Sequence, residues 1–456
     1  MSTTSWVANL MTEPDFGDVR LDKRLLVLLD QLAAQPTASL PQACGDWKNT
    51  KAAYRFLNSE KVTPKGIRDT HYFQTWRRLL GEDRILALTD TTDLDLSSKP
   101  QMQGVGPLGA KKTQGLKVHS VLLATPRGVP LGLVAQNVWA RDPTKTGQSK
   151  DWRKRPLEEK ESRKWLTALE ETERAVPENR CVVLIGDREA DLFPLFAAAR
   201  RPKTDFLVRA AYDRRVTEEA HTIKAALAQA PVAGTQTLSL RSREGKPSRE
   251  AVLTVRFATV TLLAPAYYKG EYENVTLQAI EAVETAPPAG EAPLRWILLT
   301  TLPVTDFVGA CECLVWYGHR WLIEQYHRVL KSGCRIEEMQ LQTAARLEVA
   351  LALYCIVAWR LLWLTFQARE TPDVSCERIL EPHQWQALYC AVHQTPLAPE
   401  KPPSFRQAIR WMAQLGGFLA RKGDGEPGVQ TLWRGWQRLQ DIAETWKLLQ
   451  PKKTYG

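Results

Sequence analysis

The sequence lacks the residue patterns of several common enzyme classes. Its seven histidines include no HxxxH or HxH pair, which argues against a zinc hydrolase. No GxxxxGK[ST] motif is present, so the chain is not an ATP-driven motor. The eight cysteines form no double CxxC pattern, and the spacing of Cys311 and Cys313 is too tight for a zinc ribbon. Most cysteines lie in apolar segments, so we interpret them as reduced core thiols of a cytosolic protein.

The sequence also has little that points to a membrane. Residues 1–18 contain no basic segment followed by an apolar run, so we expect no secretory signal. The most apolar stretch, Val349–Phe366, is interrupted by Arg360. This pattern favours a buried helix over a membrane span. We therefore expect no membrane partner.

Basic residues are in moderate excess, with 61 Lys and Arg against 51 Asp and Glu, a net charge of +10. Residues 71–369 carry 41 basic and 34 acidic side chains, a net charge of +7, so most of the excess lies in the middle of the chain. A positive balance favours a polyanionic partner. Because 44% of the 456 residues are hydrophobic, there is enough apolar material for a sizeable core.

The first 70 residues have the pattern of a small helical module. Leucines recur at helical spacing from Leu21 to Leu32, and residues 49–57 continue the pattern. Lys48, Lys51 and Arg55 suit a DNA-binding helical bundle. A helical cap with a solvated basic face fits these residues equally well.

From residue 84 the pattern changes to that of a mixed α/β sheet. Buried strands are predicted at 84–90, 116–124, 130–139, 181–187, 206–209 and 294–301, with a helix at 157–173. Alternating segments between about 220 and 290 predict a small antiparallel β insertion. The chain is then predicted to be helical from 307 to 367, with a break near Ser332-Gly333. A proline-rich connector with a possible short helix at 384–392 leads to a last helical pair at 404–419 and 428–449.

Three carboxylates stand out within the α/β region. Asp90 and Asp187 follow buried strands, where ligands and catalytic groups gather, although a helix cap or turn residue would fit each of them as well. Glu324 lies in the helical segment Tyr317–Lys331. At 100° per residue, Tyr317, Arg320, Glu324 and Lys331 share a face about 60° wide. A solvated helix surface could also have this composition.

Three carboxylates that converge on one point repel one another unless cations lie between them. Two Mg²⁺ ions would relieve this repulsion. They would also activate an attacking hydroxyl and stabilise the leaving oxygen in an in-line displacement.

Six motifs in order give the sequence a family resemblance. It resembles the DDE transposases of the insertion-sequence-four group, and most closely the Tn-five type. The motifs are Ala53-Tyr-Arg-Phe56, Asp90-Thr-Thr92, Lys160-Glu-Ser-Arg-Lys-Trp165, Gly186-Asp-Arg-Glu-Ala-Asp191, the YREK spacing Tyr317-x2-Arg320-x3-Glu324-x6-Lys331, and the pair Leu415-Gly-Gly-Phe418 with Leu432-Trp-x-Gly-Trp436.

The resemblance implies an α/β fold of three parts. These are a helical DNA-end-binding module at 1–70, an RNase H-like catalytic core at 71–369 with the β insertion at about 220–290, and a helical dimerisation domain at 370–456. It implies that Asp90, Asp187 and Glu324 are the catalytic metal ligands for two Mg²⁺ ions, with Mn²⁺ as a possible substitute. The implied reaction is cut-and-paste transposition: end cleavage, hairpin formation and reopening, then strand transfer into target DNA.

The resemblance also implies DNA contacts. Trp296 would stack on a flipped base, although a tryptophan in LRWILLT is typical of a core residue. The implied DNA-binding residues are Tyr317, Arg320, Lys331, Arg188, Trp296, Arg209, Trp321, Tyr54 and Arg55. Gln340 and Arg346 depart from the family pattern, so the end sequence recognised is expected to differ.

The expected partners are element ends, target DNA and a second copy of the chain in a synaptic complex with two ends. The expected location is the bacterial cytosol, in association with the nucleoid. Two alternatives stay open: a DNA-binding repressor descended from a transposase, and an RNase H-like nuclease that cuts without joining. Dimerisation through 404–449 also has an alternative, in which Trp411, Trp433 and Trp436 only form the core of that part.

Overall fold

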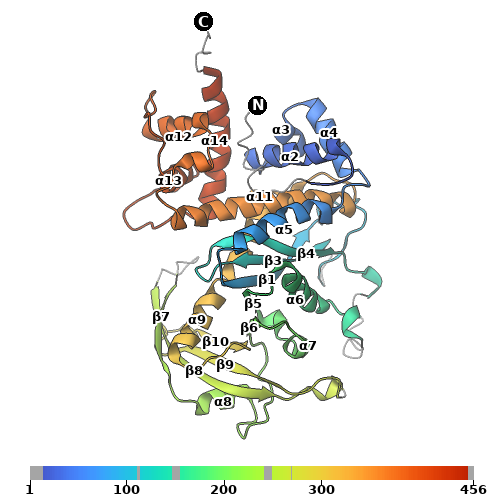
Figure 1. Cartoon of the computed structure of the whole chain (residues 1–456), viewed down its shortest axis with the longest axis vertical. Coiled ribbons are helices and arrows are strands. Elements are labelled where there is room, and N and C mark those ends of the chain that lie inside the picture. The colour runs from blue at the N-terminus through green and yellow to red at the C-terminus, as the bar shows by residue number, and fades with distance from the viewer. Residues whose placement is uncertain (1–13, 110–112, 146–154, 241–248, 269, 450–456) are drawn as a thin grey trace.

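A mixed β-sheet forms the centre of the molecule, with most helices stacked above one end of it (Figure 1). The computed structural model describes residues 14–109, 113–145, 155–240, 249–268 and 270–449. Within these residues the sheet has ten strands in the order β2-β3-β1-β5-β6-β10-β9-β8-β7, with β4 paired to β3. The strands are β1 (Arg84–Asp95), β2 (Gly106–Pro107), β3 (Gln114–Ala124), β4 (Pro130–Trp139), β5 (Cys181–Gly186), β6 (Thr204–Arg209), β7 (Gly234–Leu240), β8 (Arg249–Leu262), β9 (Val275–Glu284) and β10 (Arg295–Thr300).

The α-helices fall into an N-terminal group, connections around the sheet and a C-terminal group. They are α2 (Val19–Ala34), α3 (Leu40–Cys44), α4 (Trp47–Leu57), α5 (Pro64–Leu79), α6 (Arg163–Ala175), α7 (Phe193–Ala197), α8 (Ile223–Gln229), α9 (Phe307–Gly318), α10 (Trp321–Arg328), α11 (Ala344–Glu370), α12 (Pro382–His393), α13 (Phe405–Leu415) and α14 (Val429–Leu449). Three short turns matter for the site: η4 (Arg188–Ala190), the π-helical η6 (Val329–Gly333) and η7 (Ile336–Glu338).

Half of the sheet has the pairing of the predicted catalytic core. β4, β3 and β1 are antiparallel, whereas β1, β5 and β6 are parallel. The chain reaches β5 through α6 and β6 through α7. This arrangement fits an RNase H-like core.

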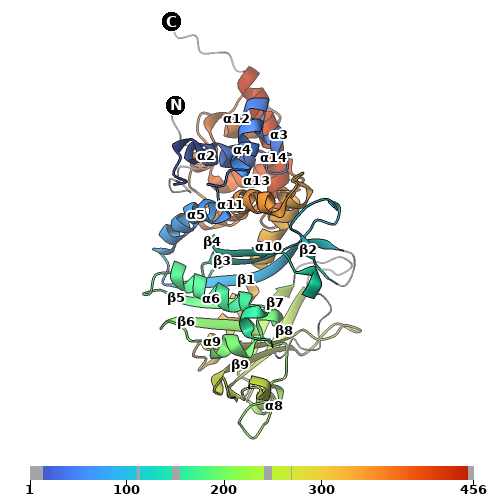
Figure 2. The same cartoon turned by 90° about the vertical axis from the view of Figure 1, so that its right-hand side faces the viewer.

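The other half continues the same sheet. The alternating segments predicted as antiparallel strands form β7, β8 and β9, which pair in sequence. β10 pairs with β9 on one side and with β6 on the other, so it joins these strands to the core. In Figure 2, β8 and β9 lie below β5 and β6.

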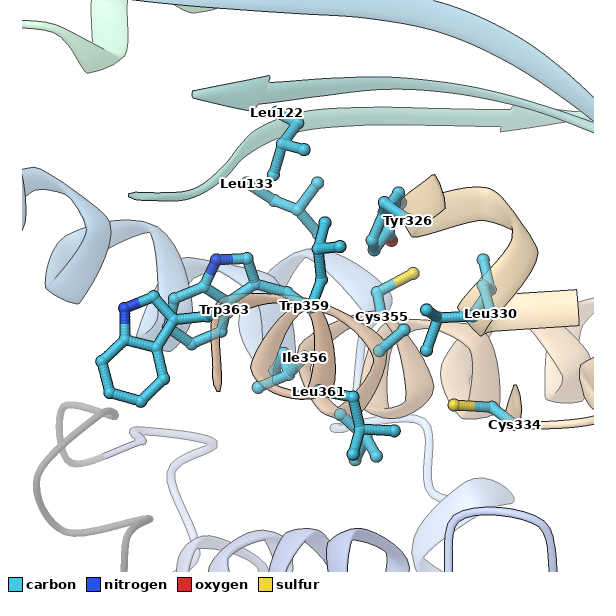
Figure 3. Packing of buried hydrophobic residues seen from close by; sticks show 14 of the residues in the cluster. Leu122, Leu133, Tyr326, Leu330, Cys334, Cys355, Ile356, Trp359, Leu361 and Trp363 are labelled. Atoms are coloured by element: carbon cyan, nitrogen blue, oxygen red, sulfur yellow. The ribbon is translucent and has the colours of Figure 1, made fainter. Parts of the chain in front are cut away.

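The apolar stretch predicted as a buried helix forms α11. By length and composition α11 could cross a membrane, but 89% of its most apolar window is buried inside the protein. Figure 3 shows Trp359 and Cys355 of α11 among Leu122, Leu133 and Tyr326. Thus α11 is the core helix between the sheet and the terminal helices (Figure 1).

The N-terminal and C-terminal helices pack on α11 and on each other. Helix α5 runs through residue 70, where a domain boundary was expected. The indole of Trp436 donates a 2.8 Å hydrogen bond to the carbonyl of Ala33 on α2. Trp433 and Trp436 are buried, which agrees with the alternative interpretation that these two residues form core. They pack within the chain because α14 lies against α11 and α2.

The cysteine prediction agrees with the structure. All eight are free thiols; six are buried, and Cys181 and Cys311 are partly buried. Burial raises the pKa of most of these thiols, which keeps them protonated and unreactive.

Candidate catalytic site and DNA interface

Asp90 lies where the two neighbours of β1 diverge. The parallel pairing with β5 ends at Leu88, opposite Ile185, whereas the pairing with β3 continues through Asp90 to Asp95. The prediction that the strand ends at Asp90 was therefore wrong, because β3 goes on supplying hydrogen bonds. The carboxylate still leaves β1 at the carboxyl edge of its parallel part, where ligands bind in such sheets.

Asp187 follows β5 in a tight turn. Only glycine fits at the position before it, residue 186. A Cβ on Gly186 would lie 2.5 Å from the Cβ of Ala190 and 3.1 Å from the Trp165 ring. Asp187 accepts a 2.9 Å bond from the amide of Glu189, so it also serves as the cap that was its alternative interpretation. Arg188 is exposed beside it.

Glu324 does not share one continuous helix with Tyr317 and Lys331. Tyr317 lies at the end of α9, Glu324 lies on α10, and Lys331 lies in the π-helical turn η6. The prediction that these side chains share one face about 60° wide was therefore wrong. The helix is interrupted at residues 319–320, and the π-helical turn after residue 328 changes the angle between successive side chains. Tertiary packing instead places Tyr317 beside Arg320 and Lys331 against β1, three residues beyond Asp90.

Arg320 links two of the acids. Its guanidinium contacts the carboxylate of Glu324 and lies 3.9 Å from that of Asp90. Burial raises the pKa of Asp90 to about 6; the charge of Arg320 opposes this rise, and the charges of Asp187 and Glu324 add to it. The ionisation of Asp90 is therefore disfavoured by the other two carboxylates and favoured by one arginine.

His327 is a site residue that the sequence reasoning missed. It is buried, with Nδ1 3.8 Å from the Asp90 carboxylate. Burial, with a smaller contribution from Lys331, lowers the pKa of His327 to about 3, so the imidazole is neutral beside Asp90. Its place three residues after Glu324, one helical turn on, was a usable signal.

The donor chemistry of the acids fits hard divalent cations, which prefer carboxylate oxygens. The side-chain geometry fits less directly: among the described residues, no group of three or more His, Cys, Asp or Glu is close enough to hold an ion. Glu324 is held by Arg320. Coordination by all three acids therefore requires the Glu324 side chain to turn away from Arg320.

An aromatic and cationic cluster borders the acids. The rings of Trp296 and Tyr317 meet edge to face with centroids 5.5 Å apart. Burial raises the pKa of Tyr317, while the charges of Arg320 and Arg209 oppose the rise. Arg209 also donates to the carbonyl of Arg295 at 3.3 Å. The structure thus brings four of the predicted DNA-contacting residues together, and Trp296 is only partly buried.

The other predicted contacts differ in exposure, and those on α4 belong to the N-terminal helices. Trp321 is exposed at the start of α10. Arg55 is exposed on α4, whereas Tyr54 of the same helix is partly buried. Tyr54 lines a pocket of about 270 Å³ between α3, α4 and residues 334–341, and Gln340 lines it too. The N-terminal helices therefore meet the segment that follows Lys331.

Helix α4 presents a basic face to solvent. Asp46 caps it by accepting the amide of Asn49 at 2.7 Å. Thr50, Ala53 and Phe56 are buried on the opposite side. The exposed face carries Trp47, Lys48, Lys51 and Arg55.

The fold and the chemistry of the acids fit one class, that of metal-dependent enzymes that transfer DNA phosphoryl groups. Family profiles identify the family. A profile for transposase DNA-binding matches residues 3–62, one for the transposase DDE domain matches 108–360, and one for the transposase Tn5 dimerisation domain matches 356–450. The DDE profile covers more than half of the chain, and the chain belongs to the DDE transposases.

It follows that the chain is a metal-dependent DNA-cleaving and strand-transferring enzyme. DNA and a second copy of the chain are its partners. Asp187 and Glu324 lie within the DDE match, and Asp90 precedes it.

Proposed function

We propose that this transposase moves its insertion sequence by cut-and-paste transposition in the bacterial cytosol, as a member of the insertion-sequence-four group. The steps are end cleavage, hairpin formation and reopening, and strand transfer. The observation that carries the proposal is the electrostatic coupling of Asp90 with Asp187, Glu324 and Arg320 at the carboxyl edge of the sheet. A homodimer would act on two DNA ends in one synaptic complex.

Asp90, Asp187 and Glu324 would hold two Mg²⁺ ions, with Mn²⁺ as a substitute. Bound there, the ions would supply activation of the attacking hydroxyl and stabilisation of the leaving oxygen. Tyr317, Arg320 and the other cations would hold the phosphates on either side of the scissile bond. The same acids would serve each step, because every step is phosphoryl transfer.

Trp296 would stack on a base displaced during hairpin formation. Its indole is partly buried and is supported edge-on by Tyr317, so the ring is held without being enclosed. Arg188, exposed beside Asp187, and Arg209 would bind the hairpin phosphates. Trp321, also exposed, would contact the same DNA.

The exposed face of α4 would read the element end. Lys48, Lys51 and Arg55 carry the positive charge that binds DNA phosphates, and Trp47 offers an apolar surface to base edges. Tyr54 would act at the junction with residues 334–341. Selection of bound duplexes from a random pool identifies the end sequence.

The C-terminal helices would pair two copies. Leu448 and Leu449, at the end of α14, are more than three-quarters exposed. Replacing both with Glu should leave the chain folded and abolish assembly on paired ends. Removal of residues 371–456 is a poorer test, because it exposes the core side of α11 that Trp433 and Trp436 cover.

The central test uses purified protein, Mg²⁺ and duplexes that carry the selected end. Wild-type protein should nick, form a hairpin and join free ends to plasmid DNA. Asp90→Ala, Asp187→Ala and Glu324→Ala should each lower cleavage by at least about 1,000-fold while end binding persists. Wild-type protein that binds ends without cutting would identify a repressor, and cutting without joining would identify a nuclease. Retained cleavage in one variant removes that residue from the site.

A further inference from the structure

Lys331 is held at two points, one on β1 and one on η7, the turn that follows Lys331 in the chain. Its ammonium donates a 2.8 Å hydrogen bond to the carbonyl of Asp93 and lies 3.1 Å from the Oε1 atom of Glu337. Asp93 is three residues beyond Asp90 on the same strand. These two contacts therefore fix the ammonium relative to the strand that carries the first acid.

An unusual backbone path delivers Glu337 to this position. After the π-helical turn η6, Arg335 adopts the left-handed conformation, with φ 51° and ψ 38°. Side-chain-bearing residues adopt this conformation rarely, and such turns cluster at functional sites. The turn carries Glu337 back onto β1, where the same Oε1 atom accepts the amide of Asp95 at 2.8 Å. Lys99 also donates to the carbonyl of Glu337.

We propose that Glu337 is a positioning residue for Lys331. This inference rests on the proposed function, in which Lys331 binds a phosphate near the scissile bond. A lysine ammonium sits on a flexible four-carbon stem and has three protons. Glu337 and the Asp93 carbonyl take two of them, which directs the third toward a phosphate beside Asp90. Glu337 also anchors the end of β1 through the amide of Asp95, so the distance between the Lys331 ammonium and Asp90 stays fixed.

The adjacent residue supplies a matched control. Glu338 lies in the same turn, but it is exposed and pairs with Arg335. Glu337→Gln and Glu338→Gln remove the same charge from the same segment, and only the first touches Lys331. The glutamine at 337 keeps an oxygen for the amide of Asp95, so we expect both variants to unfold within about 2 °C of wild type.

The first measurement does not depend on DNA chemistry. Native full-length protein is reductively methylated, and modification of each lysine is followed by mass spectrometry. Glu337→Gln should raise the rate at Lys331 by about 2- to 5-fold, the range expected on loss of a partly exposed ion pair. Glu338→Gln should leave it unchanged. An unchanged Lys331 rate in Glu337→Gln overturns the proposal.

The second measurement is single-turnover cleavage of saturating end DNA with Mg²⁺. Glu337→Gln should slow cleavage about 5- to 10-fold in wild type and have no further effect in a Lys331→Gln background, because it acts through Lys331. Equal slowing in both backgrounds indicates a local structural role and refutes the proposal, as does faster cleavage. Wild-type protein that fails to cleave refutes the proposed function alone, since the methylation rates still decide the role of Glu337.

Discussion

The cations at the carboxyl edge of the sheet and those of α4 are held in different ways. Arg320 is largely buried between Asp90 and Glu324, and Lys331 is fixed by Glu337. Lys51 on α4 extends into solvent. A cation held by protein acids keeps one geometry and acts on the rate of reaction. A solvated cation contributes affinity through counterion release and adds little orientation.

Loss of Arg320 should give the largest effect at the sheet edge. We expect Arg320→Gln to slow single-turnover cleavage by about 100-fold, because it removes a positioned charge from beside two acids, while end affinity stays within about 3-fold. Arg328→Gln, which changes an exposed arginine at the far end of α10, is the control and should cleave at the wild-type rate. If Arg320→Gln instead weakened DNA binding and left the cleavage rate of bound DNA unchanged, the proposed difference between the sheet edge and α4 would be wrong.

The Asp90 carboxyl should make the protein less stable at neutral pH than in acid. Its folded pKa of about 6 lies above the usual 3.8, so the folded state binds its proton more tightly than the unfolded state. The resulting penalty is absent below about pH 4, grows between pH 4 and 6, and is complete at pH 7. Asp90→Asn removes it, so we expect this variant to be more stable than wild type at pH 7 by on the order of 2 kcal/mol. Urea unfolding in EDTA measures the difference.

Asp95 on the same strand offers a control of opposite sign. Hydrogen bonds from Ser97 lower the pKa of Asp95, so its ionised form favours the folded state. Asp95→Asn should therefore lose a little stability at pH 7, and the loss should vanish as the pH falls. A gain from both variants would show that the Asp90 effect is general charge relief and not local burial.

Substitution on α4 should give the smallest effect. Lys51→Ala should weaken end binding by about 3-fold and reduce the slope of log affinity against log salt by about 0.9, with the cleavage rate of bound DNA unchanged. Lys65→Ala is the control, because Lys65 is paired with Asp69 on α5. A slower cleavage rate for Lys51→Ala at saturation would mean that α4 also orients the DNA.

Local sequence patterns predicted the helices and strands better than the points where these elements end or break. Strand β4 matches the predicted bounds of 130–139, and the apolar stretch within α11 is a buried helix. The helical wheel over Tyr317–Lys331 failed, because no local pattern announced the break at 319–320 or the π-helical turn. Strand β1 runs past Asp90 because its length depends on β3, a partner that a single segment cannot reveal.

The sequence alone determined the type of protein, because the acids and the YREK residues carry their chemistry in their identity and order. It also determined which segments are apolar enough to be buried. Only the tertiary structure decided which side chains meet. The Asp95–Glu337 bond joins residues 242 positions apart, and Trp436 reaches Ala33 across 403 positions. Such contacts depend on the path of the backbone between the two residues. Packing on α11 and the strand order of the sheet determine that path.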